Sequence, residues 1–245
     1  LLGFRAARSH HVVPVDQCLV ADPLLNELRS SMRASAANGI EEVSTRVGVS
    51  ESESAVWWEP SEVPFGDLPT NAAVGPSGSI HEVVEGHRFR VSSSSFFQAS
   101  PAAATALVRA VRRAAGDAAT WSDHPVIDLY GGIGLFAATV VPSDHEVIVV
   151  ESNRTACADA VANLAGRRAE VVCSEVARWK PVRASVVIAD PARTGLGASA
   201  SAVVAATEAP VVVLVSCDPA SLGRDVGLLT KSGYRLEYSE VLDLF

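Results

Sequence analysis

The sequence predicts an α/β protein: a doubly wound, mostly parallel sheet preceded by a smaller α+β domain with antiparallel strands. From about residue 93 onward, unbroken Val- and Ile-rich segments alternate with helical segments, a pattern typical of strands that helices cover on both faces. Before that point, short segments alternate polar and apolar residues between Gly, Pro and Ser clusters, as antiparallel strands do. We therefore expect one domain over residues 1–92 and a second over residues 93–245.

The smaller domain is expected to contain one helix and several strands. Leucines at helical spacing predict a helix over 22–38, with Asp22 as its cap and Pro23 in its first turn. Strands are expected within 41–50, 54–60 and 79–92. Four consecutive serines at 92–95 predict a linker to the second domain.

In the second domain, predicted strands and helices alternate along the chain. A helix over 100–116 begins at a Ser-Pro cap and ends at Gly116. The segments that follow are strands within 125–130, 146–152, 169–174, 184–191 and 210–217, helices over 153–165, 199–208 and 219–231, and a last segment at 234–245. This alternation predicts parallel pairing of the strands.

Composition places the chain among well-folded globular proteins and limits its partners. The chain has 245 residues, of which 48% are hydrophobic, and a net charge of −8. Its apolar runs reach only about six residues, too short to span a bilayer, so no membrane association is expected. Four cysteines without CxxC spacing favour reduced thiols in a cytoplasmic protein.

The negative charge argues against a large nucleic-acid surface, because phosphates attract cations. Its distribution is uneven, however, since residues 41–62 hold six glutamates. A local basic face is available elsewhere, from Arg5, Arg8, Arg193 or Arg224. Of these, Arg193 and Arg224 are the candidate substrate-binding residues.

Glycines follow the first strand of the second domain, in the segment VIDLYGGIGLFAA at 126–138. Gly132, Gly134 and Ala137 satisfy the pattern GxGxxG/A, so a dinucleotide site is one interpretation of this turn. Glu151 ends the second strand, where a carboxylate accepts the ribose hydroxyls of NAD or of S-adenosylmethionine. Glu151 alone therefore does not discriminate between the two cofactors.

Two further positions favour methyl transfer to a base. Asp190 and Pro191 end the fourth strand, at the carboxyl edge where ligands of such sheets bind. The fifth strand brings Cys217 to the same edge, and the helix predicted from Pro219 would favour its thiolate. A methyltransferase that acts on a base needs polar groups there, facing both the methyl donor and the base edge.

Five segments together resemble the RNA uracil-C5 methyltransferase family, which makes 5-methyluridine in tRNA and ribosomal RNA. They are SFFQAS, IDLYGGIGLFA, VVESNRTACADAVANL, VVIADPARTGLG and the stretch that begins LVSCDPASLGRD, in the family's order over residues 95–245. The opening segment at 2–20 is also similar to the family's central domain. The resemblance implies a class I, Rossmann-like fold, S-adenosylmethionine as methyl donor, and a tRNA or rRNA uridine as substrate.

The resemblance also implies roles for single residues. Gln98, Tyr130, Glu151 and Asp190 match cofactor contacts, and Cys217 matches the nucleophile. In this chemistry a thiolate adds to C6 of uracil, C5 attacks the sulfonium methyl, and a base then removes the C5 proton. The uridine has to swing out of its stack to reach such a pocket.

The chain departs from the family pattern at several positions. Gly131 stands where the family usually has cysteine, Ala192 replaces a proline and Asp218 replaces an asparagine. The Asp218 carboxylate is expected to oppose formation of a thiolate at its neighbour Cys217. Cys18 matches the last of four iron–sulfur ligands, so a [4Fe–4S] cluster would need three more thiolates from a longer parent chain.

The ends of the chain also differ from the family. The family's catalytic glutamate follows the segment that DLF at 243–245 matches, and Glu237, Glu240 and Asp243 do not match its position. We therefore expect this chain to be either trimmed at both ends or a reduced homologue. It is expected to lack the family's last strand and the catalytic base, so its turnover should be impaired.

Three other interpretations stay open. The chain could be a non-catalytic protein that binds RNA or the cofactor, or a nicotinamide-dependent oxidoreductase, which would leave Asp190 and Cys217 without a role. Methylation of cytosine C5 uses the same thiolate chemistry, but its nucleophile usually follows the fourth strand.

No metal is predicted, because the histidines at 10–11 have no second ligand pair at zinc spacing. The tryptophans at 57–58 are expected to pack on a sheet or, alternatively, to stack on RNA.

Overall fold

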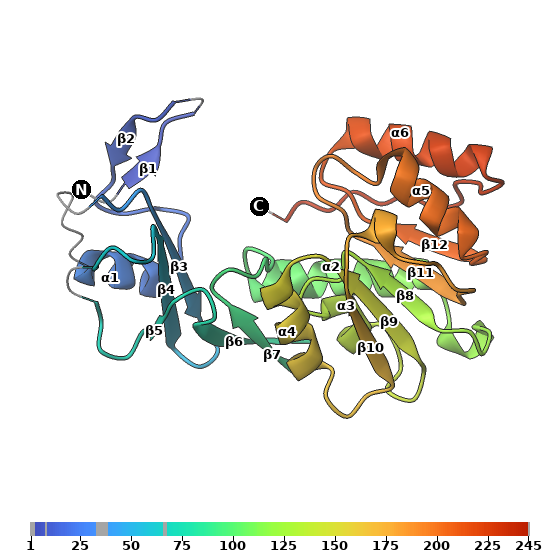
Figure 1. Cartoon of the computed structure of the whole chain (residues 1–245), viewed down its shortest axis with the longest axis horizontal. Helices are drawn as coiled ribbons and strands as arrows, with labels where there is room; N and C mark the ends of the chain where they lie inside the picture. The colour runs from blue at the N-terminus through green and yellow to red at the C-terminus, as the bar shows by residue number, and fades with distance from the viewer. Residues whose placement is uncertain (1–2, 8, 33–38, 66–67, 245) are drawn as a thin grey trace. The chain divides into compact units, whose positions relative to one another are not determined.

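The computed structural model describes residues 3–7, 9–32, 39–65 and 68–244 (Figure 1). The chain divides into two compact units. The first contains Leu1–Glu82 and Arg90–Ser94, and the second contains Val83–Phe89 and Ser95–Phe245. Arg8 and the end of the predicted first helix, 33–38, lie outside the described residues. Within the described part, no helix is both long and apolar enough to cross a membrane.

The second unit contains a five-stranded, all-parallel sheet in the order β10-β9-β8-β11-β12. Its strands are β8 (Val126–Leu129), β9 (Val147–Glu151), β10 (Ala169–Cys173), β11 (Val186–Ala189) and β12 (Val211–Leu214). All residues of β8 and β11 are buried, which explains why these segments are apolar without alternation. The predicted doubly wound parallel fold is confirmed.

Helices cover both faces of this sheet (Figure 1). They are α2 (Pro101–Ala115), α3 (Leu135–Thr139), α4 (Arg154–Asn163), α5 (Gly197–Ala206) and α6 (Pro219–Lys231), with short 3-10 turns η2 (Ala118–Thr120) and η3 (Val176–Arg178). Ile127, Leu129 and Val187 share one core with residues of α5 and α6. The Ser100 and Gly116 caps of α2 match the sequence prediction, because both residues satisfy end groups that the helix leaves unpaired.

The structure corrects two predictions at the end of this unit. β12 ends at Leu214, so Cys217 lies three residues beyond the strand rather than at its tip. The backbone N–H of Val215 still donates to the carbonyl of Ala189 at 2.8 Å, and after that residue the chain leaves the sheet. The segment 234–244 forms no helix or strand, and Val241 within it is 96% exposed.

The first unit is built on α1 (Pro23–Ser31), which packs on the antiparallel pair β3 (Glu42–Gly48) and β4 (Glu53–Glu59). Asp22 caps α1 as predicted, accepting the N–H of Leu24 at 2.9 Å. A third strand, β5 (Ala73–Val74), pairs with β4 in parallel, so the expectation of antiparallel strands fails for this pair. The pair β1 (Gly3–Arg5) and β2 (Val12–Pro14) and the pair β6 (Ser79–Val84) and β7 (His87–Ser92) complete the strands of the described residues.

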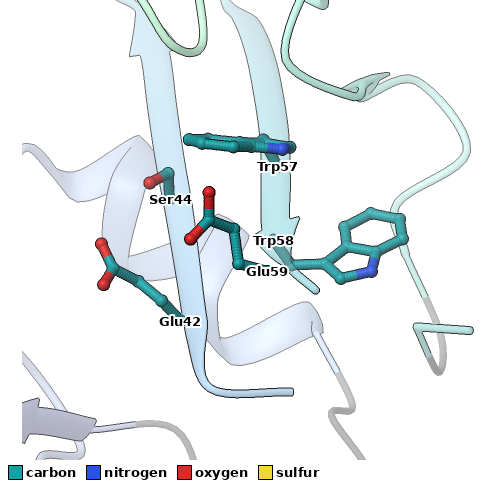
Figure 2. A pocket seen from close by; sticks show the side chains of 5 residues that line it. All are labelled: Glu42, Ser44, Trp57, Trp58 and Glu59. Carbon is teal, nitrogen blue, oxygen red and sulfur yellow. The ribbon is translucent and has the colours of Figure 1, made fainter. Parts of the chain in front are cut away.

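The two adjacent tryptophans of β4 have different surroundings. Trp58 packs against the core formed by Leu28, Met32 and Val56, and its Nε1–H donates to the carbonyl of Val63 at 2.8 Å. Because side chains alternate along a strand, Trp57 lies on the opposite face of the sheet. There it lines a hollow of about 110 Å³ (Figure 2) with four neighbours, Glu42, Ser44, Trp58 and Glu59.

The serine segment at 92–95 contains the boundary between the two units, and two of its serines are buried. Ser92 and Ser95 are buried, and the Ser95 hydroxyl donates to the buried carboxylate of Asp159 on α4 at 2.6 Å. The segment is therefore anchored within the second unit at Ser95.

Close contact between β9 and the turn after β8 makes Gly131 intolerant of a side chain. A methyl group at Gly131 would lie 2.6 Å from Cγ1 of Val149. We expect Gly131→Ala to lower the free energy of unfolding by about 1–3 kcal/mol through overpacking. In a double-mutant cycle with Val149→Ala, the double variant should lose less stability than the two single variants lose together, by at least about 0.5 kcal/mol. Urea denaturation measures all three variants, and strict additivity would contradict this contact.

Candidate active site

The candidate site lies where the direction of chain winding reverses. β8 is followed by β9 on one side, whereas β11 lies on its other side and is followed by β12. Open parallel sheets bind their ligands at the carboxyl end of the strands beside such a point. Strand register places Tyr130, Glu151 and Asp190 at the same level of this edge, because Leu129 pairs with both Val150 and Ala189.

The glycine turn after β8 has a backbone that most side chains would strain. Tyr130, Gly132 and Gly134 have φ values of 58°, 53° and 84°. Glycine adopts this left-handed conformation without steric cost, but a tyrosine does not, and such strain is concentrated at functional sites. Space around Gly132 is open, since a methyl group there would meet no atom within 4 Å. The turn therefore leaves room for a ligand beside its backbone.

Glu151 joins this turn to the start of α4. Its carboxylate accepts the backbone N–H of Gly132 at 3.0 Å, and those of Ser152 and Asn153 at 2.7 Å each. Three N–H donors fix both carboxylate oxygens at the end of β9. The side chain remains partly exposed, so its outer lone pairs are available to hydroxyl donors.

Asp128 is a fully buried carboxyl group beneath the glycine turn. Its Oδ2 accepts the N–H of Ala137 on α3 at 3.0 Å, whereas Oδ1 has no hydrogen-bond partner. Burial, with smaller contributions from the charges of Asp190 and Glu151, raises the pKa of Asp128 to about 7. The three acids therefore interact electrostatically at one point of the edge.

Asp190 directly follows β11, and its backbone N–H continues the ladder to Leu129 at 3.3 Å. Burial raises the pKa of this carboxyl to about 6. A half-desolvated carboxyl at a ligand-binding edge is typical of functional sites. The structure thus brings Asp190 together with Tyr130 and Glu151, as the sequence predicts.

Cys217 is exposed in the segment between β12 and α6. The next residue, Asp218, is the N-cap of α6, and its Oδ1 accepts the N–H of Ser221 at 2.7 Å. This bond lowers the pKa of Asp218, and the charge of Arg193 lowers it further. The Asp218 carboxylate therefore caps α6 and keeps its negative charge, which stands beside Cys217 as the sequence predicts.

The loop 190–197 is held against α6 by one buried carboxylate, Asp225. It accepts the N–H of Leu196 at 2.6 Å and that of Gly197 at 3.1 Å, so it satisfies the first turn of α5. A methyl group at Gly195 would lie 2.1 Å from Oδ2 of Asp225, which excludes any larger residue there. Asp225 also raises the pKa of Tyr130, secondarily to burial, so it lies near the candidate site.

The two candidate RNA-binding arginines differ in their contacts. Arg224 donates to Asp225 at 2.8 Å and to the carbonyl of Thr194 at 2.5 Å, so its guanidinium supports the loop. Arg193 is exposed, and its carbonyl accepts the Ser221 hydroxyl at 2.9 Å. Arg193 therefore remains the better placed of the two for a phosphate.

The remaining predicted positions lie elsewhere. Gln98 is half-buried in the irregular segment just before α2. In the first unit, the backbone N–H of Cys18 donates to the Asn26 side chain at 2.9 Å, and the Asn26 amide donates back to the carbonyl of Cys18 at 3.0 Å. No group of three or more cysteines that could hold a metal is found among the described residues.

Sequence reasoning assigned no role to two carboxylates of this site, Asp128 and Asp225. Asp128 gives a signal, because an acid inside an otherwise apolar strand is costly to bury without a role. Asp225 gives none, since its partners lie 28 and 29 residues away in the chain.

Comparison with solved structures places this fold. Against the Pyrococcus abyssi tRNA (uracil-54, C5)-methyltransferase in complex with S-adenosyl-L-homocysteine, the TM-score is 0.68 at 22% identity. The match covers 93% of this chain and 66% of that one. The chain thus has the fold of the class I S-adenosylmethionine-dependent methyltransferases.

No protein-family model matches the chain, but comparison with single proteins finds relatives named RNA methyltransferases. The chain is 30% identical to an uncharacterized RNA methyltransferase of Streptomyces avermitilis, over 99% of this chain and 60% of that protein. A second uncharacterized RNA methyltransferase, from Streptomyces coelicolor, is 29% identical over 99% of this chain and 57% of that protein. By sequence, the chain is a homologue of proteins named RNA methyltransferases. It spans about three fifths of the length of these relatives.

Removal of the Asp225 carboxylate should destabilise the loop that carries Asp190 and Arg193. Asp225→Ala leaves the backbone N–H groups of Leu196 and Gly197 without their acceptor and removes one partner of the Arg224 guanidinium, so we expect the free energy of unfolding to fall by about 2–4 kcal/mol. Asp123→Ala, a change at an exposed aspartate, should cost less than about 0.5 kcal/mol. Chemical denaturation of both variants measures the difference, and equal stabilities would refute the anchoring role.

The buried Asp128 carboxyl should make stability depend on pH. Because its pKa is raised to about 7 in the folded protein, the native state keeps a proton that the unfolded chain loses near 3.8, and stability falls as pH rises between these values. Asp128→Asn stays neutral and should lack this slope, gaining up to about 3 kcal/mol on wild type between about pH 5 and pH 8. Urea denaturation across this range tests it, and parallel curves for the two proteins would contradict it.

Proposed function

We propose that this chain carries the activity of a cytoplasmic, S-adenosylmethionine-dependent RNA uracil-C5 methyltransferase that acts on a uridine of tRNA or rRNA. The observation that carries the proposal is the meeting of a glycine turn, Glu151 and Asp190 at the reversal point of the sheet, with Cys217 two residues beyond the level of Asp190. In this proposal residues 93–245 form the methyltransferase domain and residues 1–92 an accessory domain.

The residues of the edge suit a cationic, ribose-containing methyl donor. Asp128 has a buried oxygen without a partner, and the open space at Gly132 lies beside the Glu151 carboxylate. Carboxyl groups that repel one another are stabilised by a nearby positive charge, and S-adenosylmethionine has both an ammonium and a sulfonium group. In the proposed complex, Glu151 accepts the ribose hydroxyls, Asp190 faces the donor, and Tyr130 and Gln98 line its path. When bound, the donor supplies an electrophilic methyl group.

The same features disfavour the nicotinamide dinucleotide. A pyrophosphate needs free N–H groups at the start of the helix that follows the glycine turn. Here the Ala137 N–H of the five-residue α3 is already bound to Asp128. Three nearby acids would also repel the two phosphate charges. A dehydrogenase would in addition leave Cys217 without a role.

Cys217 is proposed to act as the nucleophile on the uracil ring. Its thiolate adds to C6, which makes C5 electron-rich enough to take the methyl group, and a base then removes the C5 proton as the C6–S bond breaks. Exposure of Cys217 next to the N-terminus of α6 gives a flipped base access to the sulfur. Arg193, exposed near this helix, is proposed to bind an RNA phosphate.

Trapping with fluorinated RNA tests the nucleophile and the donor together. In tRNA and rRNA transcribed with 5-fluorouridine, fluorine replaces the proton that the base must remove, so the adduct persists after methyl transfer. We expect a denaturation-resistant protein–RNA band that requires S-adenosylmethionine. This readout does not depend on the releasing base.

Two cysteine variants make the test specific. Cys217→Ser should abolish the adduct, whereas Cys173→Ser, a change at another exposed thiol, should leave it intact. Glu151→Gln should demand at least about tenfold more S-adenosylmethionine for the same yield, because one lost charge-assisted hydrogen bond weakens binding by 1.5 kcal/mol or more. Calorimetric binding of S-adenosylmethionine without any adduct would instead indicate a non-catalytic cofactor-binding protein.

A further inference from the structure

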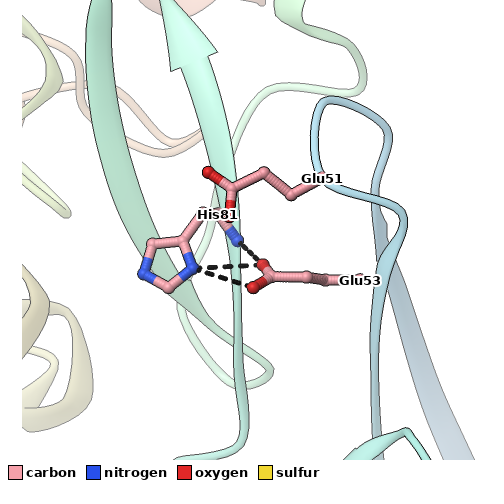
Figure 3. A group of neighbouring side chains, drawn as sticks. All are labelled: Glu51, Glu53 and His81. Carbon is pink, nitrogen blue, oxygen red and sulfur yellow. Dashed lines mark hydrogen bonds and ion pairs between the residues drawn. The ribbon is translucent and has the colours of Figure 1, made fainter.

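A cluster of three potential metal ligands lies in the first unit, on the turn between β3 and β4, at the first residue of β4 and on β6 (Figure 3). It consists of Glu51, Glu53 and His81, whose ligand atoms all lie within 4.8 Å of one another. His81 lies 28 positions after Glu53 in the sequence, so only the folded unit brings it to the two glutamates. None of them belongs to the edge of the parallel sheet where methyl transfer is proposed.

The backbone around the cluster is held by contacts that do not involve the three ligands. Glu82, which is 4% exposed, accepts the N–H of Val49 at 3.2 Å and the hydroxyl of Ser50 at 3.3 Å. A methyl group at Gly48 would lie 2.7 Å from the carbonyl oxygen of His81, so β3 and β6 approach closely there. The segment that carries Glu51 is thus fixed to β6 independently of any ion, as a preorganised site requires.

The imidazole of His81 and the carboxylate of Glu53 contact each other directly as a hydrogen-bonded ion pair, and the distances between their atoms also suit two ligands on one ion. Nδ1 of His81 lies 3.2 Å from Oε1 and 3.1 Å from Oε2 of Glu53, and the backbone N–H of His81 donates to Oε2 at 2.5 Å. Two ligand atoms that each lie about 2.1 Å from an ion, at 90–110° to one another, are separated by about 3.0–3.4 Å. The observed distances fall within this range.

The donor set indicates the class of ion. Two carboxylates and one imidazole suit Mn²⁺, Fe²⁺, Co²⁺ or Zn²⁺, whereas Ca²⁺ and Mg²⁺ prefer oxygen ligands alone. The two carboxylates that Glu51 and Glu53 bring to one point would also attract a divalent cation. Glu51 is exposed and Glu53 and His81 are half-buried, so solvent can complete the coordination.

We propose that Glu51, Glu53 and His81 form a binding site for a single divalent first-row transition-metal ion in the first unit. Its effect would be to link the segment after β3 to β6, and to place a positive charge on a unit that carries the six glutamates of 41–62.

Manganese is the most suitable probe, because the four free thiols of the chain compete poorly for it. Electron paramagnetic resonance of free Mn²⁺ measures the bound fraction directly. We expect one equivalent of Mn²⁺ to bind to the intact chain, and Zn²⁺ to displace it, because Zn²⁺ ranks above Mn²⁺ in affinity. Failure of the chain to bind one equivalent would overturn the proposal, whatever the outcome of the trapping experiment.

Matched variants locate the ion. His81→Gln and Glu51→Gln should each weaken Mn²⁺ binding at least about tenfold. His87→Gln changes an exposed histidine of β7 whose Nδ1 lies near the carbonyl of Glu85, and should bind Mn²⁺ as wild type does. Glu51 is exposed, so its variant is expected to keep the fold, which circular dichroism checks. Equal affinity of the Glu51→Gln and His87→Gln variants would place the ion elsewhere and refute the site.

Discussion

Burial of both faces of the parallel sheet decides where this molecule can do chemistry. β8 and β11 are buried along their whole length, so every polar side chain within them must be satisfied internally or remain neutral. Asp128 is the one charged residue in these two strands, and burial moves its pKa to about 7. In the central strands, other polar side chains follow only where the strands end. The ends of β8, β9 and β11 lie side by side at one edge, which concentrates Tyr130, Glu151 and Asp190 there.

Two carboxylates, Glu151 and Asp225, fix the loops at this edge by accepting their backbone N–H groups. Glu151 binds three backbone N–H groups and so fixes the glycine turn against α4. Asp225 does the same for the loop after β11, where it caps α5 from the neighbouring α6. A carboxylate that accepts several N–H groups sets the direction of each at once. The site is therefore shaped by local electrostatics more than by apolar packing.

The elements that the sequence predicts well are those with local signals. Proline and cap residues define α2 and α6 to within a residue, and apolar runs locate all five parallel strands. The failures involve distant partners: β5 pairs in parallel with β4, and 234–244 finds no strand to pair with among the described residues. Glu53 and His81 meet only because β6 returns to β4.

The contact between Gly195 and Asp225 has a consequence for the history of this sequence. A methyl group at Gly195 would overlap Oδ2 of Asp225, and Asp225 in turn holds the N–H groups that follow Gly195. Neither residue can change alone without cost, so the two constrain each other's evolution across thirty positions. In distant homologues, a glycine in the loop after the fourth strand and an aspartate in the helix after the fifth strand should therefore be kept or lost as a pair. That pairing offers a marker for aligning relatives in which overall identity has become too low to guide the alignment.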